Sequence, residues 1–207
     1  PSYSLDQKQN EATSQEKTLK TATTDEEIKN VSAALSKQNT PENVSTKEIN
    51  GEKYVVFNGD GLEGYDPRSQ RKVVRQYMRD NFLGKEYNVD GKILKITPKG
   101  IKKMSIYTND GQTKIYTILD KVIENAKYYG EALNYHDNLS DSKVYYFTSK
   151  VYLNGNLKEY KIITKPDGTI YNVYDVQDNV KYKEKSQAYP PSGPRSGGQS
   201  SEMRGKG

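Results

Sequence analysis

The sequence predicts an α+β fold, with helices packed on one face of a twisted antiparallel sheet that ends in a three-stranded meander. Three observations predict it. Helical apolar periodicity precedes the C-terminal strands, three strand-like segments follow one another between residues 143 and 176, and the turns between them are too short for a crossover. Strands joined by such turns are antiparallel, and helices before a meander are typical of α+β domains.

The first predicted element is a short helix at residues 24–38. Thr24 or Asp25 can cap it, and its apolar residues share one face. These residues are Ile28, Val31 and Leu35. Polar, linker-like segments flank the helix, so we expect it to be isolated from the domain, either docking elsewhere or forming only transiently.

The folded domain is expected to begin with a short strand at residues 54–57, which a turn at 58–61 ends. Asp66 then caps a helix that has Pro67 at its first position and ends near Phe82. Both termini of this helix therefore carry clear local signals.

A turn at residues 89–92 and a strand at 93–96 predict a hairpin, after which residues 99–107 are expected to be extended. The clearest 3.6-residue pattern of the chain predicts a further helix at about 113–126. Residues 128–141 are interpreted as a loop.

The meander is predicted at residues 143–153, 157–165 and 169–176, with turns at 154–156 and 166–168. Side chains alternate between the two faces of a strand, so the first strand divides into two sets. The set expected to face the helices is Tyr145, Phe147, Ser149, Val151 and Leu153. The set expected on the open face is Val144, Tyr146, Thr148, Lys150 and Tyr152.

The chain is therefore divided into three parts. Residues 1–48 are interpreted as a flexible linker that contains the short helix, residues 49–186 as the α+β domain, and residues 187–207 as a disordered tail rich in Pro, Gly and Ser.

Composition limits the chemistry. The chain has no Cys, which excludes disulfides, a thiol nucleophile and cysteine-bound zinc, and its single histidine, His136, excludes two-histidine metal sites within one chain. No nucleotide-phosphate loop motif occurs, and no apolar run is long enough to cross a membrane. We expect a soluble protein without metal or cofactor. The net charge of +5 favours polyanionic partners.

The helix after Pro67 carries a basic stripe within an arc of about 100°. Its members are Arg68, Arg71, Lys72, Arg75 and Arg79. Like charges on one face repel unless a polyanion neutralises them, and the planar arginine head group suits phosphate. The stripe is either a nucleic-acid-binding surface or a solvated face paired with acidic residues elsewhere in the fold.

The open face of the meander offers tyrosine rings with interleaved lysines, which suit stacked bases and phosphates. Tyrosine and threonine are also ordinary residues of exposed sheets, so the same pattern fits a surface without function.

Metal-free RNA cleavage needs a base, a cation that holds the phosphate and an acid. His136, Lys143 and a tyrosine could supply these groups, although a lone histidine in a polar loop is more often a bystander.

Five stretches of the chain resemble domains of phage and conjugative-element proteins. They are 77–85 (YMRDNFLGK), 101–103 (IKK), 118–126 (ILDKVIENA), 145–147 (YYF) and 150–155 (KVYLNG). The chain resembles the large polyvalent protein-associated domains assigned to the barnase–EndoU–colicin–RelE-like (BECR) nuclease superfamily.

This resemblance implies a helix-then-sheet fold, nuclease ancestry directed mostly at RNA, and a place within a larger multidomain protein. It implies sites built from His, Lys, Arg, Tyr, Thr and acids on the sheet. The candidate catalytic residues here are Lys102, Lys103, His136, Lys143, Tyr146, Thr148 and Lys161.

The sequence leads to a metal-independent endoribonuclease-like toxin or effector module that is delivered into a target bacterial cytoplasm. The alternative is a non-catalytic module that binds nucleic acid or an acidic partner such as an immunity protein. Candidate residues gathered in one cleft would favour the enzyme, whereas lysines scattered over a flat sheet would favour the binding module.

Overall fold

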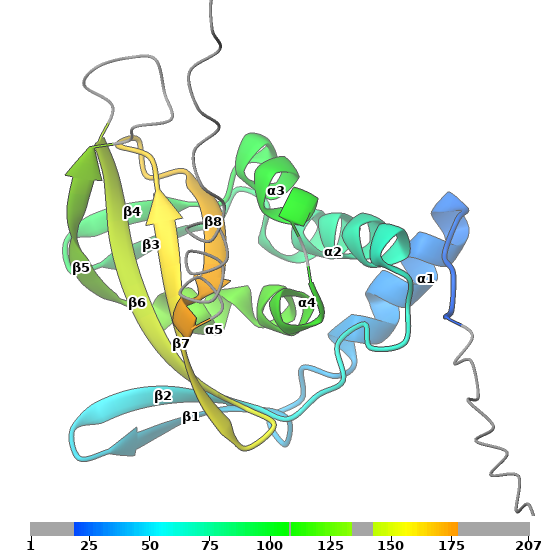
Figure 1. The fold of residues 1–207 in the computed structure, drawn as a ribbon, viewed down its shortest axis with the longest axis horizontal. Helices are drawn as coiled ribbons and strands as arrows, with labels where there is room; N and C mark the ends of the chain where they lie inside the picture. Colours follow the sequence, from blue (N-terminus) through cyan, green and yellow to red (C-terminus); the bar gives the residue numbers. More distant parts are fainter. Residues whose placement is uncertain (1–18, 108, 134–142, 178–207) are drawn as a thin grey trace, which may run out of the picture.

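A computed structural model of the chain describes residues 19–107, 109–133 and 143–177. Helices and strands alternate in groups along the chain (Figure 1). The helices are α1 (Asp25–Ser36), α2 (Pro67–Phe82), α3 (Pro98–Met104), α4 (Asp110–Thr117) and α5 (Leu119–Glu124), with the 3-10 turn η1 (Ser105–Tyr107) after α3. The strands are β1 (Val44–Ile49), β2 (Glu52–Phe57), β3 (Glu86–Val89), β4 (Lys92–Lys95), β5 (Lys127–Leu133), β6 (Lys143–Leu153), β7 (Asn156–Thr164) and β8 (Ile170–Asp175).

Six strands form one sheet in the order β1-β2-β6-β7-β8, and β5 also pairs with β6. The predicted α+β class and the antiparallel meander β6-β7-β8 are confirmed. The sheet is mixed rather than wholly antiparallel, because β2 runs parallel to β6. Short turns fix strand direction only within the meander, whereas the long connection from β2 to β6 allows a parallel pairing.

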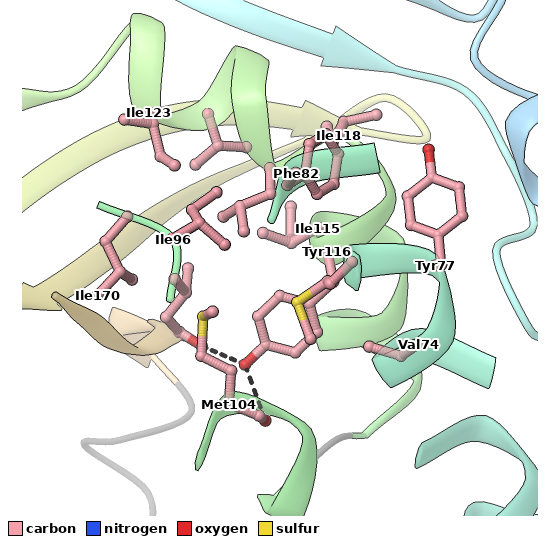
Figure 2. Packing of buried hydrophobic residues seen from close by; sticks show 14 of the residues in the cluster. Val74, Tyr77, Phe82, Ile96, Met104, Ile115, Tyr116, Ile118, Ile123 and Ile170 are labelled. Atoms are coloured by element: carbon pink, nitrogen blue, oxygen red, sulfur yellow. Dashed lines mark hydrogen bonds between the residues drawn. The ribbon is translucent and has the colours of Figure 1, made fainter. Parts of the chain in front are cut away.

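The core lies between the helices and the inner face of the sheet. Phe147, Val151 and Ile162 of the meander are fully buried there, as are Val122 and Ile123 of α5. Figure 2 shows apolar side chains from α2, α4 and α5 meeting in this cluster, with the Tyr116 ring among them. The Tyr116 hydroxyl donates a hydrogen bond to the Met104 carbonyl at 3.3 Å, which satisfies its polar atom inside the core.

The helix α2 has the predicted bounds. The Asp66 side chain accepts hydrogen bonds from the backbone N–H groups of Arg68 and Ser69, and Pro67 occupies the first turn. The first N–H groups of a helix have no partner within the helix. The Asp66 side chain accepts hydrogen bonds from two of them, and Pro67 has no N–H group to satisfy.

The extended conformation predicted for residues 99–107 is wrong, because α3 and η1 occupy this segment. The Thr97 side chain accepts from the Gly100 N–H at 3.1 Å, and Pro98 takes the first helical position. This cap-then-proline start is the one that Asp66 and Pro67 give α2.

The single helix predicted at residues 113–126 is two helices, α4 and α5, which meet at Ile118. The Thr117 carbonyl accepts hydrogen bonds from the Tyr77 hydroxyl at 2.9 Å and from the Asn39 side chain. The Thr117 carbonyl at the end of α4 therefore has its hydrogen-bond donors in α2 and in the segment after α1, at the point where the helix is interrupted.

The loop predicted at residues 128–141 is also corrected, because β5 covers its first part and pairs antiparallel with β6. A bulge between Tyr128 and Gly130 interrupts the strand. An inserted residue breaks the two-residue alternation by which strands are recognised. Residues 134–141, including His136, lie outside the described residues.

The helix predicted at residues 24–38 is α1, but it is not isolated. It packs on α2, burying Ile28 and Leu35, and the Ala22 N–H just before it donates to Ser69 of α2 at 2.8 Å. The strand β1 also begins inside the segment 1–48 that was interpreted as a linker. The predicted tail at 187–207 lies outside the described residues.

We predict that Gly100→Ala destabilises the domain, because a Cβ at Gly100 would stand 2.2 Å from the Ile170 carbonyl oxygen of β8. Overpacking of this kind costs about 1–3 kcal/mol, which urea unfolding would measure. In the control Gly111→Ala the new Cβ comes no nearer than 3.5 Å to another group. Equal stability of the two variants would contradict this account of the contact between α3 and β8.

A second prediction concerns Tyr77, whose burial raises its pKa to about 12. The folded pKa is higher than the unfolded value of about 10, so the stability that the neutral phenol contributes is complete below pH 10 and is lost as pH rises towards 12. Tyr77→Phe should cost about 1 kcal/mol at pH 7 and make the alkaline loss of stability shallower. Urea unfolding from pH 7 to 12, with Tyr129→Phe as the exposed control, would test this; an unchanged alkaline slope in Tyr77→Phe would refute it.

Candidate nucleic-acid interface

The basic residues predicted on α2 form a continuous surface, which we call the α2 stripe. It consists of Arg68, Arg71, Lys72, Arg75 and Arg79. Val73, Val74 and Tyr77 on the opposite side of the helix are buried, so packing fixes the rotation of α2 and leaves the stripe outward. All four arginines of the described residues lie in this stripe.

Three of the stripe residues donate hydrogen bonds to uncharged acceptors. The Arg71 Nε donates to the Pro67 carbonyl at 3.1 Å, and the Arg75 Nε donates to the Ser105 hydroxyl at 3.0 Å. Lys72 reaches the Thr23 carbonyl at 3.5 Å. Within the described part of the chain no carboxylate forms an ion pair with the stripe, whereas six lysines elsewhere are paired with acids. The described residues therefore do not support the alternative in which acidic residues of the same domain neutralise the stripe.

A groove of about 410 Å³ runs between α1 and the stripe. Its lining residues are Asp25, Ile28, Lys29, Lys72, Arg75, Gln76 and Arg79. Lys29 of α1 thus adds a cation to the stripe, and Asp25 is the acid in the lining. Sequence reasoning missed Lys29 because α1 was expected to lie apart from the domain.

Lys102 and Lys103 of α3 are exposed and lie close to the stripe rather than on the sheet. The Ser105 hydroxyl that accepts from Arg75 donates to the Lys102 carbonyl at 3.0 Å. This connection places the C-terminal end of α3 beside α2, so both lysines extend the basic surface of the helical side.

A second surface is the face of the sheet directed away from α4 and α5, which we call the outer face. The predicted alternation along β6 is confirmed for most positions, since Phe147, Ser149, Val151 and Leu153 are buried. Tyr146, Thr148, Lys150 and Tyr152 are half-buried on the outer face. Val144, which was expected on the open face, is buried.

Three predicted catalytic residues come together on the outer face. Thr148 of β6 is the direct cross-strand neighbour of Lys161 of β7. The Lys161 Nζ lies 5.0 Å from the centre of the Tyr146 ring and 5.3 Å from that of Tyr129. A cation, a hydroxyl and two phenol rings therefore meet at one place.

The other candidates do not join this group. Lys143, at the start of β6, forms an ion pair of 2.8 Å with Glu131 of β5, and the hydrogen bond that it donates to Glu131 raises the pKa of the lysine. Lys102 and Lys103 lie on the helical side, and His136 falls outside the described residues. The seven predicted catalytic residues are thus not gathered in one cleft.

A second aromatic group lies at the far end of the outer face and is neutralised. The Tyr54 and Tyr152 rings are 5.5 Å apart, and Lys150 lies over Tyr54 while forming an ion pair with Glu52. The hydrogen bond from Lys150 lowers the pKa of Glu52, so the carboxylate stays charged and balances the lysine.

The described residues contain no group of three acidic or histidine side chains that could hold a metal ion. Likewise, none of the described helices is both long and apolar enough to cross a membrane.

Residues 65–174 match the family model of large polyvalent protein-associated domain 3, which is more than half of the chain. The chain belongs to this family. No curated protein and no solved structure was matched in the corresponding comparisons. The domain 3 match begins just before α2 and ends in β8, so it contains the α2 stripe and the part of the outer face that β5, β6 and β7 form. The resemblance to large polyvalent protein-associated domains is confirmed, and the chain is a domain of the kind found in larger polyvalent proteins.

Proposed function

We propose that this domain is a nucleic-acid-binding module of a larger polyvalent protein, and that it holds the phosphate backbone on the α2 stripe. The observation that carries the proposal is the absence of ion pairs from five aligned cations within the described residues. Aligned like charges repel one another, and a polyanion relieves this repulsion by replacing bound counterions.

The chemistry of the stripe favours phosphate over an acidic protein as the partner. Four of its five cations are arginines, whose planar head groups form two parallel hydrogen bonds with phosphate oxygens. From Arg68 to Arg79 the stripe extends for roughly 17 Å along one side of the helix, which suits a backbone with regularly spaced charges. An acidic partner remains the alternative outcome of the binding test.

The proposal predicts that Arg71→Gln/Arg79→Gln weakens binding to RNA and DNA with little dependence on sequence. Each lost phosphate contact lowers the slope of log affinity against log salt by about 0.7–0.9, so the double variant should lower it by roughly 1.4–1.8. Fluorescence anisotropy across a salt series would measure both effects.

The matched control is Lys47→Gln/Lys53→Gln on the β1-β2 hairpin, which removes the same charge from exposed positions. If both double variants weaken binding equally, net charge rather than the stripe is responsible. If the unaltered domain binds no nucleic acid but captures an acidic protein through these arginines, the proposal is wrong about the partner.

A second candidate function is metal-independent RNA cleavage on the outer face. The meeting of Tyr146, Thr148 and Lys161 favours it, together with the resemblance to BECR nucleases. Lys161 would stabilise charge on the phosphate, and a hydroxyl would take part in proton transfer. The separation of the other candidate residues makes binding the better supported function.

Cleavage predicts that the whole chain cuts RNA into discrete products in EDTA, and that Lys161→Gln slows it by about 100-fold or more, as is typical when a group that stabilises transition-state charge is lost. Gel analysis of labelled RNA would show this, with Lys53→Gln as the control. RNA that stays intact in the presence of the unaltered protein would exclude this candidate and leave binding as the function.

A further inference from the structure

The bulge in β5 exposes an aromatic ring on the outer face. It lies between Tyr128 and Gly130, where the strand register shifts against β6. Tyr129 has 70% of its surface exposed, the largest exposed fraction among the large apolar and aromatic side chains in the part of the chain that the structure describes. Its neighbour in the strand, Gly130, pairs with Tyr146 and places no side chain of its own beside the Tyr146 ring. Bulges are common where a strand re-aims a side chain towards a functional site.

Lys161 supplies a cation at the same place. Its Nζ lies over both the Tyr129 and the Tyr146 rings, and it forms no ion pair with a carboxylate of the described residues. This distinguishes it from Lys150 on the same face, which pairs with Glu52. Two aromatic rings therefore orient Lys161 without neutralising it.

A second lysine lies in line with this group. Cross-strand pairing places Lys127 of β5, Thr148 of β6 and Lys161 of β7 in one row. The two lysines are two strands apart, which corresponds to roughly 10 Å. The row thus offers one cation on each side of a hydroxyl, with the exposed Tyr129 and the half-buried Tyr146 nearby.

We infer that this part of the outer face binds a single-stranded segment of nucleic acid, with unpaired bases stacked on Tyr129 and Tyr146 and phosphates held by Lys127 and Lys161. The inference deepens the proposed function by naming unpaired strands as a ligand, but it concerns a different surface. It requires no cleavage, and it uses none of the stripe residues.

The preference for a single strand follows from the chemistry of the surface. The rings can stack only on bases that are not already stacked and paired within a duplex. Each stacked base contributes enough to change affinity by roughly 5- to 150-fold when the ring is removed. A duplex would offer this surface its phosphates alone.

The two surfaces can be tested separately, because they lie on different sides of the domain. The stripe faces outward from α2, and the outer face belongs to the side of β6 and β7 opposite α4 and α5 (Figure 1). A variant on one surface therefore leaves the contacts of the other intact.

The experiment measures anisotropy of the full chain with a short single-stranded RNA, the same RNA as a duplex, and an abasic strand of equal length. Tyr129→Ser should weaken binding of the single strand about fivefold or more and leave the duplex and the abasic strand unchanged. Tyr129→Phe keeps the ring and should bind like the unaltered chain. Lys161→Gln should weaken the single strand and the abasic strand alike. Because the Tyr129 ring is exposed, its removal is compatible with folding, which a thermal melt would verify.

Unchanged binding of the single strand by Tyr129→Ser would overturn the inference, and so would an equal loss for the abasic strand. The stripe variant Arg71→Gln/Arg79→Gln separates the two proposals. If the stripe variant loses duplex binding and Tyr129→Ser binds every ligand normally, the stripe proposal is supported and the stacking proposal is refuted. If Tyr129→Ser loses only the binding of single strands and the stripe variant binds normally, the stacking proposal is supported and the stripe proposal is refuted.

Discussion

The pairing of β6 with three other strands is the constraint on which the rest of the domain depends. This strand of 11 residues bonds to β7 along one edge, while β5 and β2 share its other edge. Its alternation gives Phe147 and Val151 to the core and Tyr146, Thr148 and Lys150 to the outer face. A shift of register by one residue would exchange these sets and would expose the core, so burial fixes which side chains are presented outside.

The helix α2 shows the same coupling of burial and presentation on the other side of the domain. Tyr77 and Met78 are buried, and the Tyr77 hydroxyl reaches the carbonyl at the end of α4. These contacts fix the rotation of the helix about its axis. The arginines are therefore directed outward by the packing of the opposite face, and their charge is not compensated by the described residues around them.

The distribution of ion pairs distinguishes structural from available charge. Six lysines of the sheet and the short helices are paired with acids, and surface pairs of this kind contribute little to stability. The arginines of the stripe and Lys161 differ because their described partners are carbonyls, hydroxyls and aromatic rings. Groups of this second kind keep their capacity to bind a phosphate.

The sequence by itself determined the elements whose signals are local. The cap and proline at Asp66 and Pro67, the turns of the meander and the alternation along β6 were sufficient for α2, for the order of the last three strands and for most of the side chains on each face. The membership of the basic stripe also follows from helical spacing alone.

Tertiary structure decided the features that depend on distant contacts. It placed α1 on α2, gave β2 a parallel partner in β6, divided α4 from α5 through the Thr117 carbonyl, and separated Lys102 and Lys143 from the group at Lys161. The physical reason is that spacing along the chain fixes which side of an element a residue occupies, whereas the neighbours of that side are chosen by packing between segments far apart in the sequence.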